Sequence, residues 1–460
     1  MYHIGRDNHP ICSEGEGCTM YMNQNEAVCA CGRIHRCELE RLIVGKNALA
    51  ALPSVVRDLG SRRVFLLADA NTYAAAGRRV EAILAGEGIP CKKHVFPGLV
   101  EPDETAVGSA VMHFDKACDL VLAVGSGVIG DVSKILAGIS GAEYAIVATA
   151  PSMDGYASST SSMTRNGLKV SLPSKCARVI IGDTDILKNA PMEMLVSGLG
   201  DMLAKYVSIA EWRISHIVTG EYYCEAVADL IRRSLQTCVD HADGLIRREE
   251  AAVEAVFEGL VTAGAAMSYA GVSRPASGVE HYFSHLWDMR GVEFGDKTST
   301  HGIQCAVATL ITARLYDTLK TYRPDPERAI SFARGFSREA WFEELTAFLG
   351  KGARDMIAQD EREQKYDPEK HGKRLAVILD RWEELTAIMK EEIPSAAWVE
   401  DLLTRIGCPL TPEAWGGSSV LLPTAFKATK DIRDKYVLSR LAYDLGILDD
   451  LAALTNRKET

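Results

Sequence analysis

Short runs of β-branched and other apolar residues alternate with helical patterns along the first 190 residues of the chain. Runs of four to eight such residues are typical of buried strands, and the segments between them predict crossover helices. Strand–helix alternation of this kind predicts a mostly parallel sheet with helices on both faces. The predicted strands are Leu39–Val44, Arg63–Leu67, Lys93–Phe96, Asp119–Val124, Tyr144–Ala148 and Arg178–Ile181.

The segments between these strands carry helical periodicity, with one exception near the end of the region. The exception is Ser158–Ser171, where Asn166-Gly167 separates two extended runs, and this dipeptide is a strong signal for a hairpin turn. The predicted helices are Lys46–Leu59, Thr72–Gly86, Asp103–Lys116 and Gly130–Ile139.

From about Pro191 onward the strand pattern ends and amphipathic helical patterns follow one another. We therefore predict an α/β domain followed by an all-α domain, with boundaries at 1–38 for an N-terminal Cys-rich arm, 39–190 for the α/β domain and 191–460 for the helical domain. The predicted helices of the last part are Met192–Ile214, Tyr222–His241, Glu249–Tyr269, Gly302–Leu319, Phe336–Leu349, Glu369–Met389, Ala396–Ile406 and Asp431–Leu445.

Composition narrows the class of protein. A length of 460 residues suits two domains, and 47% hydrophobic residues are typical of a soluble globular chain. No apolar run approaches the roughly 18–20 residues that cross a bilayer, and the polar N-terminus carries no secretory segment. The net charge of -11 argues against nucleic acid or an anionic membrane as the main partner. We expect a cytoplasmic protein without membrane insertion.

A glycine-rich turn follows the fourth predicted strand. Gly125, Gly127 and Gly130 let the backbone approach a ligand closely, and the helix that starts there favours a pyrophosphate at its N-terminus. The spacing differs from the G-x-G-x-x-G pattern, so a purely structural turn remains an alternative. Asp69, at the end of the second strand, can bind an adenosine ribose or cap the next helix.

Two further segments hold polar side chains suited to chemistry. Thr149–Ser158 follows a strand and places hydroxyl groups around Asp154, as a substrate loop or an ordinary turn would. Asp201 lies in an otherwise apolar helical stretch, His281 and His285 share one helix face, and His301 opens another helix. One carboxylate and two imidazoles make an incomplete shell for Zn²⁺, Ni²⁺ or Fe²⁺ that leaves room for a substrate.

These stretches together resemble the glycerol-1-phosphate dehydrogenases of the dehydroquinate synthase-like and iron-containing alcohol dehydrogenase superfamily, the bacterial form most of all. The resemblance rests on Gly125–Lys134, Thr149–Ser162, Asn189–Lys205, Ser273–His285, His301-Gly302 and Ala428–Tyr436, and it runs from about Leu39 to about Leu451. It implies a Rossmann-like parallel-sheet domain followed by an all-helical domain, the dehydroquinate synthase-like fold. It also implies NAD(P)H-dependent reduction of dihydroxyacetone phosphate to glycerol 1-phosphate, a backbone of ether-type lipids, by a homodimer.

The resemblance also implies roles for individual residues. It implies one divalent metal ion held by Asp201, His281 and His301. It implies substrate contacts and catalysis by Asp154, His285 and Asp201. It places the dinucleotide against Asp69, Gly127, Val128, Ile129, Gly130, Asp131, Thr149, Ser152 and Ser158. It leaves the phosphate contacts open, with Lys205, Arg274 and Lys169 as candidates, and Asp69 favours NAD over NADP.

Two matters stay open. A polyol dehydrogenase or a cyclising lyase can share this fold and metal site, and a non-catalytic protein that retains the fold is a third alternative.

The N-terminal cysteines include Cys29-Ala-Cys31, which is one residue tighter than the usual zinc spacing. We expect reduced thiols on an exposed arm, with a small structural metal site as the alternative. The cluster comprises Cys12, Cys18, Cys29, Cys31, His35 and Cys37.

Overall fold

The computed structural model describes residues 11–12, 18–21, 28–98, 100–165 and 168–456. By its internal contacts the chain divides into two compact units, and each is described by itself. Unit 1 comprises Met1–Met202 with Cys224–Ser273, and unit 2 comprises Leu203–Tyr223 with Arg274–Thr460. The predicted boundaries at 38/39 and 190/191 stay predictions, whereas the segment after Cys224 groups with the sheet in this division.

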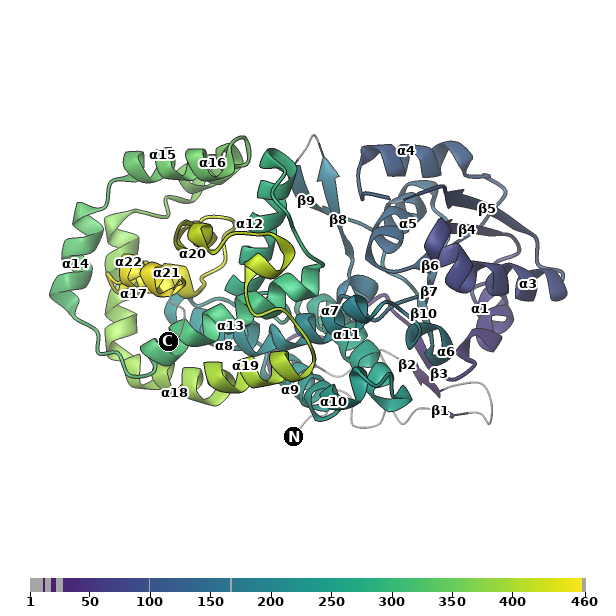
Figure 1. Cartoon of the computed structure of the whole chain (residues 1–460), viewed down its shortest axis with the longest axis horizontal. Helices are drawn as coiled ribbons and strands as arrows, with labels where there is room; N and C mark the ends of the chain where they lie inside the picture. The colour runs from purple at the N-terminus through teal and green to yellow at the C-terminus, as the bar shows by residue number, and fades with distance from the viewer. Residues whose placement is uncertain (1–10, 13–17, 22–27, 99, 166–167, 457–460) are drawn as a thin grey trace. The chain divides into compact units, whose positions relative to one another are not determined.

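Unit 1 is built on a sheet of eight strands within the described residues (Figure 1). All six predicted strands are present, and neighbours among these six pair in parallel. Two short antiparallel strands extend the sheet beyond β3, and no sequence pattern predicted them. The order is β1 (Ile11–Cys12), β2 (Cys18–Tyr21), β3 (Arg41–Gly45), β10 (Val179–Asp183), β7 (Glu143–Ala148), β6 (Leu120–Gly125), β4 (Val64–Asp69) and β5 (Cys91–Phe96).

Helices cover both faces of this sheet, which explains why β3, β4, β6, β7 and β10 are largely apolar and buried. On one face, alternate residues of β4, β6, β7 and β10 join a core with η1, α1 and α3. On the other face, Gly130 of α5 lies against Ile146 and Tyr144 of β7. The helical segments of this first part are η1 (Ala48–Ala51), α1 (Leu52–Asp58), α2 (Ala70–Thr72), the π-helical η2 (Tyr73–Gly77), α3 (Arg78–Gly86), α4 (Glu104–His113), α5 (Gly127–Ser140), η3 (Gly155–Ala157) and α6 (Thr184–Leu187).

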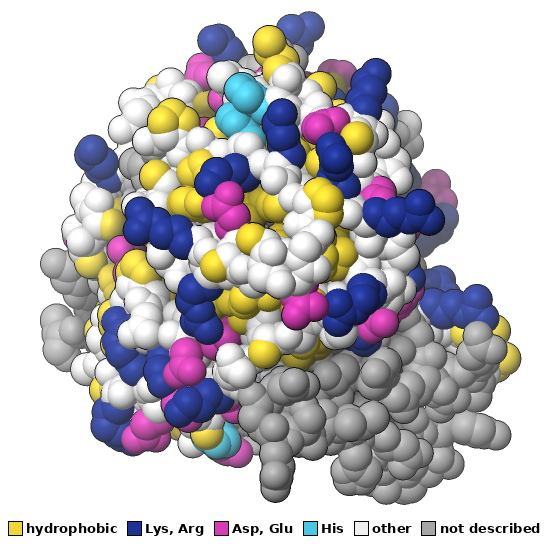
Figure 2. Space-filling view, turned by 90° about the vertical axis from the view of Figure 1, so that its right-hand side faces the viewer, with side chains coloured by type: hydrophobic (Ala, Val, Ile, Leu, Met, Phe, Trp, Pro, Cys, Tyr) yellow, Lys and Arg dark blue, Asp and Glu magenta, His cyan; other side chains and the backbone are white. Residues whose placement is uncertain are grey.

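The outermost described strand on one side is β5, which exposes Lys92 and Lys93. Charged side chains on an edge strand oppose pairing with a second sheet. Figure 2 views the molecule from the side on which Figure 1 draws β5 and α3, and it shows lysine and arginine side chains interspersed with acidic ones. The surface there is therefore of mixed charge.

The predicted hairpin is present as β8 (Thr160–Arg165) and β9 (Leu168–Pro173), which pair antiparallel with Arg165 opposite Leu168. The dipeptide Asn166-Gly167 itself lies outside the described residues.

Four later helices complete unit 1: α7 (Met192–Leu203), whose last residue falls in unit 2, α9 (Glu225–Asp240), α10 (Ala242–Leu245) and α11 (Glu250–Ala270). Helix α11 is long and apolar enough to span a membrane, which corrects the expectation that no apolar run reaches that length. It is a core helix of unit 1, because Phe257 lies so close to Gly182 of β10 that a Cβ there would collide with its ring.

The described residues of unit 2 form helices and no strand, as the sequence predicted. The prediction of one helix over Met192–Ile214 is wrong, because α7 ends at Leu203 and α8 begins at Lys205. The prediction that Asp431–Leu445 is helical is wrong for its first half, since α21 begins at Leu438. The elements are α8 (Lys205–Thr219), α12 (Val279–Phe294), α13 (His301–Leu319), α14 (Pro326–Gly335), α15 (Arg338–Leu349), α16 (Gly352–Glu363), α17 (Pro368–Asp380), α18 (Trp382–Glu392), α19 (Ala396–Arg405), η4 (Pro412–Trp415), η5 (Ser419–Leu421), α20 (Leu422–Thr429), α21 (Leu438–Asp444) and α22 (Leu448–Leu454).

Candidate active site

The glycine-rich turn joins the end of β6 to the start of α5. Ser126 is the residue before the helix, and Gly127, Val128, Ile129, Gly130 and Asp131 form its first turns. At Gly125, a Cβ would lie 2.6 Å from the Cβ of Ile129, so the turn closes this tightly only with glycine. The first amide groups of such a helix have no partner within the helix, and its dipole favours an anion there.

The Thr149–Ser158 loop lies beside this turn. The Thr149 amide donates to the Gly125 carbonyl at 3.1 Å, and the hydroxyls of Ser126 and Ser152 are 2.6 Å apart. The Tyr156 hydroxyl donates to the Ala150 carbonyl, and its oxygen lies 3.0 Å from the Ser126 hydroxyl, from which it can accept. These hydrogen bonds link the turn between β6 and α5 to the Thr149–Ser158 loop, so the predicted cofactor residues of both segments form one polar cluster.

Asp131 and Ser158 make structural contacts at the edge of this group. Asp131 accepts from the Ser162 amide and pairs with Lys134 at 3.3 Å; burial raises its pKa, and Lys134 opposes that effect. Ser158 accepts from the Thr160 amide at 3.0 Å. Lys134 was not predicted from the sequence. Its buried ammonium also donates to the carbonyls of Gly155 and Thr160, so it ties α5 to the loop and to β8.

Asp69 is the N-cap of α2. Its carboxylate accepts from the Thr72 amide at 2.8 Å, and the Thr72 hydroxyl accepts from the Asp69 amide. Of the two roles predicted for Asp69, the helix cap is therefore present. The residue lies at the carboxyl end of β4, where the ribose contact was predicted.

Asp201 lies near the end of α7, and its Oδ2 accepts a hydrogen bond from the Asp154 amide at 2.9 Å. The same helix meets the loop at Gly198, where any Cβ would collide with the Pro151 carbonyl oxygen. The Ser197 hydroxyl donates to the Ser152 carbonyl at 3.0 Å. Helix α7 thus holds the loop so that Asp154 and Asp201 are neighbours. Gly198 was missed, although a glycine within an apolar helix is a recognised sign of close backbone approach.

In unit 2, the predicted histidines gather where α12 faces the start of α13. The rings of His281 and His301 lie 5.0 Å apart, and those of His285 and His301 lie 6.5 Å apart. Cys305, one helical turn after His301, brings its Sγ to 3.6 Å from His301 Nε2. The ligand atoms of His281, His301 and Cys305 all lie within 4.8 Å of one another. Cys305 was not predicted, although its i, i+4 spacing from His301 repeats that of His281 and His285.

Hydrogen bonds orient both imidazoles. Glu280 Oε1 accepts from His281 Nδ1 at 2.8 Å, and the Ser284 hydroxyl lies 3.1 Å from His301 Nδ1. In each ring the Nε2 atom is thereby left to face the cluster, which is the usual arrangement of metal-binding histidines. Glu280 was also missed, because a buried glutamate beside a histidine has no distinctive spacing.

Burial and charge set the protonation of this cluster. Burial lowers the pKa of His285 well below its ordinary value, and the nearby charges of Arg433, His301, His281 and Lys435 lower it further. Burial alone would raise the pKa of Cys305, but His281 and His301 lower it overall. A neutral imidazole and a thiol inclined to ionise are the forms that bind a divalent cation.

Two cations near His285, Arg433 and Lys435, lie in the segment between α20 and α21. Lys435 donates to the Ser277 carbonyl at 2.8 Å, and burial lowers its pKa to about 7, with Arg274 and Arg433 contributing. Arg433 and Lys435 also line a cavity of about 360 Å³ within unit 2. Of the predicted phosphate contacts, Arg274 is buried, with Glu221, Ser215 and the Tyr436 carbonyl as its acceptors. Lys205 is buried in α8, and Lys169 lies on β9 of unit 1.

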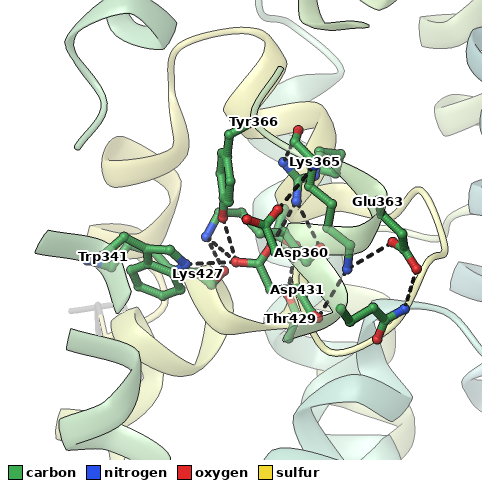
Figure 3. Close-up of polar contacts among 12 residues, drawn as sticks. Trp341, Asp360, Glu363, Lys365, Tyr366, Lys427, Thr429 and Asp431 are labelled. Carbon is green, nitrogen blue, oxygen red and sulfur yellow. Dashed lines mark hydrogen bonds and ion pairs between the residues drawn. The ribbon is translucent and has the colours of Figure 1, made fainter. Parts of the chain in front are cut away.

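A buried aspartate fixes the segment that carries these cations. Asp431 accepts from Trp341 Nε1, the Tyr366 hydroxyl and Arg440, and pairs with Lys430 at 3.0 Å (Figure 3). Burial would raise its pKa, but Lys430, Arg440 and Lys365 hold it at about 2. Lys365 donates in turn to the carbonyls of Asp431 and Arg433. The carboxylate therefore remains charged and anchors the turn that leads to Arg433 and Lys435.

Comparison with known proteins places this arrangement in a family. Residues 43–191 match the family of iron-containing alcohol dehydrogenases. A protein of Halalkalibacterium halodurans, named glycerol-1-phosphate dehydrogenase with NAD(P)+, is 35% identical over 63% of this chain and 73% of its own length. A protein of the same name from Thermococcus kodakarensis is 32% identical over 62% of this chain and 80% of its own length.

Solved structures show the same fold at lower identity. The maleylacetate reductase of Agrobacterium tumefaciens superimposes with a TM-score of 0.60 at 15% identity, over 91% of this chain and 97% of its own. This likeness, over 91% of the chain, confirms the predicted fold class, a parallel-sheet domain followed by a helical domain. The chain belongs to the glycerol-1-phosphate dehydrogenase family of NAD(P)-dependent oxidoreductases, within the iron-containing alcohol dehydrogenase and dehydroquinate synthase-like fold.

Proposed function

We propose that this chain reduces dihydroxyacetone phosphate to sn-glycerol 1-phosphate, reversibly, with NAD(P)H and one divalent metal ion. The observation that carries the proposal is the cluster in unit 2, where His281, His301 and Cys305 offer ligand atoms within 4.8 Å of one another and His285 follows one turn along α12. The names of the relatives support the substrate and the cofactor.

Asp201, His281 and His301 are the proposed metal ligands. Two imidazole nitrogens and one carboxylate oxygen are ligands that suit Zn²⁺, Ni²⁺ and Fe²⁺ alike, and Cys305 adds a softer donor that favours Zn²⁺. The Glu280 hydrogen bond to His281 fits such a role, since it fixes the ring and strengthens Nε2 as a donor. When bound, the ion polarises the substrate carbonyl as a Lewis acid.

The cofactor is proposed to bind at the carboxyl end of the sheet in unit 1. The amide groups of Gly127, Val128, Ile129, Gly130 and Asp131 suit its pyrophosphate, because they begin a 14-residue helix. The polar group formed by Thr149, Ser152 and Ser158 suits the nicotinamide side, and Asp69 suits the adenosine ribose. When bound, NAD(P)H would supply the hydride, and these residues would hold the dinucleotide in place.

Asp154 and His285 are proposed to act on the substrate. Asp201 accepts a hydrogen bond from the Asp154 amide, and the Asp154 carboxylate is the group proposed to accept hydrogen bonds from substrate hydroxyls. His285 is neutral at physiological pH because its pKa is well below its ordinary value. A neutral imidazole can donate from one nitrogen while the other accepts, which suits the relay of a proton to the carbonyl oxygen.

The phosphate is proposed to bind Arg433 and Lys435. Both cations lie near His285, and neither is among the contacts predicted from the sequence. A phosphate dianion would stabilise these two half-buried cations, and burial, with Arg274 and Arg433, lowers the pKa of Lys435. A polyol dehydrogenase would have no use for this pair, so the pair favours a phosphorylated ketone over glycerol.

The cellular setting follows from the proposed product. Glycerol 1-phosphate is a backbone for ether-type lipids, and we propose that the chain supplies it as a cytoplasmic homodimer.

The test is NADH oxidation with dihydroxyacetone phosphate on metal-stripped protein, before and after Zn²⁺, Ni²⁺ or Fe²⁺ is restored. We expect turnover only with metal, its loss in His281→Ala, and far poorer use of unphosphorylated dihydroxyacetone. Folded protein that turns over glycerol or dihydroxyacetone equally well would refute the phosphate assignment. Full turnover after verified metal removal would refute the metal assignment.

A further inference from the structure

Four side chains of unit 1 converge at a point in the fold that the proposed reaction does not use. Cys29, Cys31 and His35 come from the segment before β3, and Cys224 is the residue before α9. Their sulfur and nitrogen ligand atoms all lie within 4.8 Å of one another. The expectation that the N-terminal thiols lie on an exposed arm is wrong for Cys29, which is 8% exposed. His35 and Cys224 are also buried, at 6% and 1% exposed.

The separations fit the edges of a metal tetrahedron. The sulfurs of Cys29 and Cys224 are 3.7 Å apart, and His35 Nε2 lies 3.4 Å from the sulfurs of both Cys31 and Cys224. Zinc bonds of about 2.3 Å to sulfur and about 2.0 Å to nitrogen set tetrahedral edges of about 3.8 Å and about 3.5 Å. A disulfide would require about 2.05 Å between two sulfurs.

Backbone hydrogen bonds position the cysteine ligands before any ion binds. The Gly32 amide donates to the Cys29 carbonyl at 2.8 Å, and the Cys29 amide donates to the Arg33 carbonyl at 2.9 Å. Gly32 has φ +83°, which favours glycine at this position, and the turn brings Cys29 and Cys31 to one side despite their close spacing.

The histidine is oriented as a ligand. His35 Nδ1 lies 2.8 Å from the Tyr269 carbonyl oxygen, which can only accept, so Nδ1 carries the proton. His35 Nε2 therefore presents its lone pair to the three sulfurs. A backbone carbonyl that holds the second nitrogen is a common support of metal-binding histidines.

We propose that Cys29, Cys31, His35 and Cys224 bind a structural Zn²⁺ ion. Three thiolates and one imidazole fill a tetrahedral shell and leave no position for a substrate, which is typical of structural zinc sites. The thiols release their protons to solvent as the ion binds. The site joins residues 195 positions apart, and through His35 it fixes the end of α11 as well.

The test measures zinc in full-length protein whose catalytic cluster has been silenced by His301→Ala and Cys305→Ser. We expect about one equivalent of tightly bound zinc per chain, by mass spectrometry of the metal. Adding Cys31→Ser or Cys224→Ser should lower the zinc affinity at least about tenfold. Adding Cys37→Ser should change nothing, because Cys37 lies outside the group and donates to the Leu39 carbonyl.

Cobalt substitution provides a readout that does not need the cysteine variants to fold. The protein with His301→Ala and Cys305→Ser, loaded with Co²⁺, should show thiolate-to-cobalt charge transfer and tetrahedral d–d absorption. No zinc and no such absorption would overturn the proposal, as would zinc retained in both Cys31→Ser and Cys224→Ser. None of these results depends on turnover, so a failure of the proposed reaction would not be confused with a failure of this site.

Discussion

Glu280 accepts a hydrogen bond from Nδ1 of His281 at 2.8 Å, and the same oxygen accepts from the Gly278 amide at 2.7 Å. The glutamate is buried and lies in the first turn of the helix that carries both His281 and His285. One carboxylate oxygen thus sets both the start of α12 and the orientation of a proposed metal ligand.

Replacing Glu280 should lower the affinity for the metal ion without removing any of the proposed ligands. We expect Glu280→Ala to lower metal affinity about 10- to 100-fold, because His281 loses the partner that fixes its ring. Glu280→Gln should retain most of the affinity, since the amide oxygen can still accept from Nδ1. Dialysis against metal buffers measures both. Equal affinity in the two variants, with unfolding temperatures matching the parent, would contradict the assignment.

Cys305 and Cys408 form a matched pair for the role of the thiol. Both are buried in unit 2, but His281 and His301 lower the pKa of Cys305 overall, whereas burial raises that of Cys408 to about 12. We expect Cys305→Ala to lower zinc affinity at least about tenfold and to shift preference toward Ni²⁺ or Fe²⁺. Competition with a chromophoric chelator measures this. Cys408→Ala should leave affinity and preference unchanged.

Lys435 should recognise the phosphate group. We expect Lys435→Ala to raise KM for dihydroxyacetone phosphate by about 10-fold or more, since a hydrogen bond to a charged group contributes about 1.5–3 kcal/mol. KM for unphosphorylated dihydroxyacetone should not change. Lys370→Ala, at an exposed lysine of the same cavity, is the control.

The pH dependence gives a second test of the same lysine. Burial, with Arg274 and Arg433, lowers the pKa of Lys435 to about 7, so its ammonium loses charge as the pH rises through that value. KM for dihydroxyacetone phosphate should therefore rise across this range. Lys435→Arg, which remains charged, should flatten the profile. A profile unchanged by this substitution would argue for a different phosphate contact.

Gly198 and Gly108 both lie within helices but differ in their surroundings. A Cβ at Gly198 would collide with the Pro151 carbonyl, whereas nothing lies within 4 Å of one at Gly108. We expect Gly198→Ala to cost about 1–3 kcal/mol of unfolding free energy and to weaken NADH binding, because the loop with Ser152 must move. Gly108→Ala should stabilise by about 0.5–1 kcal/mol. Urea unfolding and fluorescence titration distinguish the two.

Asp431 should stabilise unit 2 in a pH-dependent way. Its pKa in the folded chain is about 2 against an ordinary value of 3.8, so its contribution is present above about pH 4 and is lost as the pH falls toward 2. We expect Asp431→Asn to destabilise by about 3–5 kcal/mol at neutral pH, because Lys430 and Arg440 lose their partner. The difference from the parent should shrink below pH 4. Asp449→Asn, at an exposed site, should show neither effect.

The sequence predicted the sheet well because its parallel strands, other than the edge strand β5, are buried on both faces. Each of these buried strands is a short apolar run bounded by turns, and such a run has few alternatives in a chain of this type. Strands β1 and β2 carry no such run, and the break at Ala204 between α7 and α8 has no glycine or proline to mark it. The prediction that a helix begins at Asp431 was wrong because the charged residues that follow it belong to a buried ionic network and not to a helix face.

The site was predictable as far as residue type and spacing carry information. His281 and His301 were predicted from their helical positions and the family resemblance, and the structure places their rings 5.0 Å apart. Cys305 had the same spacing signal, and it was overlooked because cysteine is more often a core residue. The partners of Asp431 and the meeting of Cys29 with Cys224 depend on contacts across long stretches of chain, which no local pattern encodes.

The discontinuity of unit 1 has a consequence for synthesis on the ribosome. Residues up to Met202 emerge first, but Phe257 of α11, which covers Gly182 of β10, comes after the chain has passed through α8. At about 5–20 residues per second, on the order of ten seconds pass between synthesis of the sheet and synthesis of α11. During that interval its apolar surface is exposed, so the nascent chain should need chaperone protection most between these two points and far less once Ser273 has left the exit tunnel.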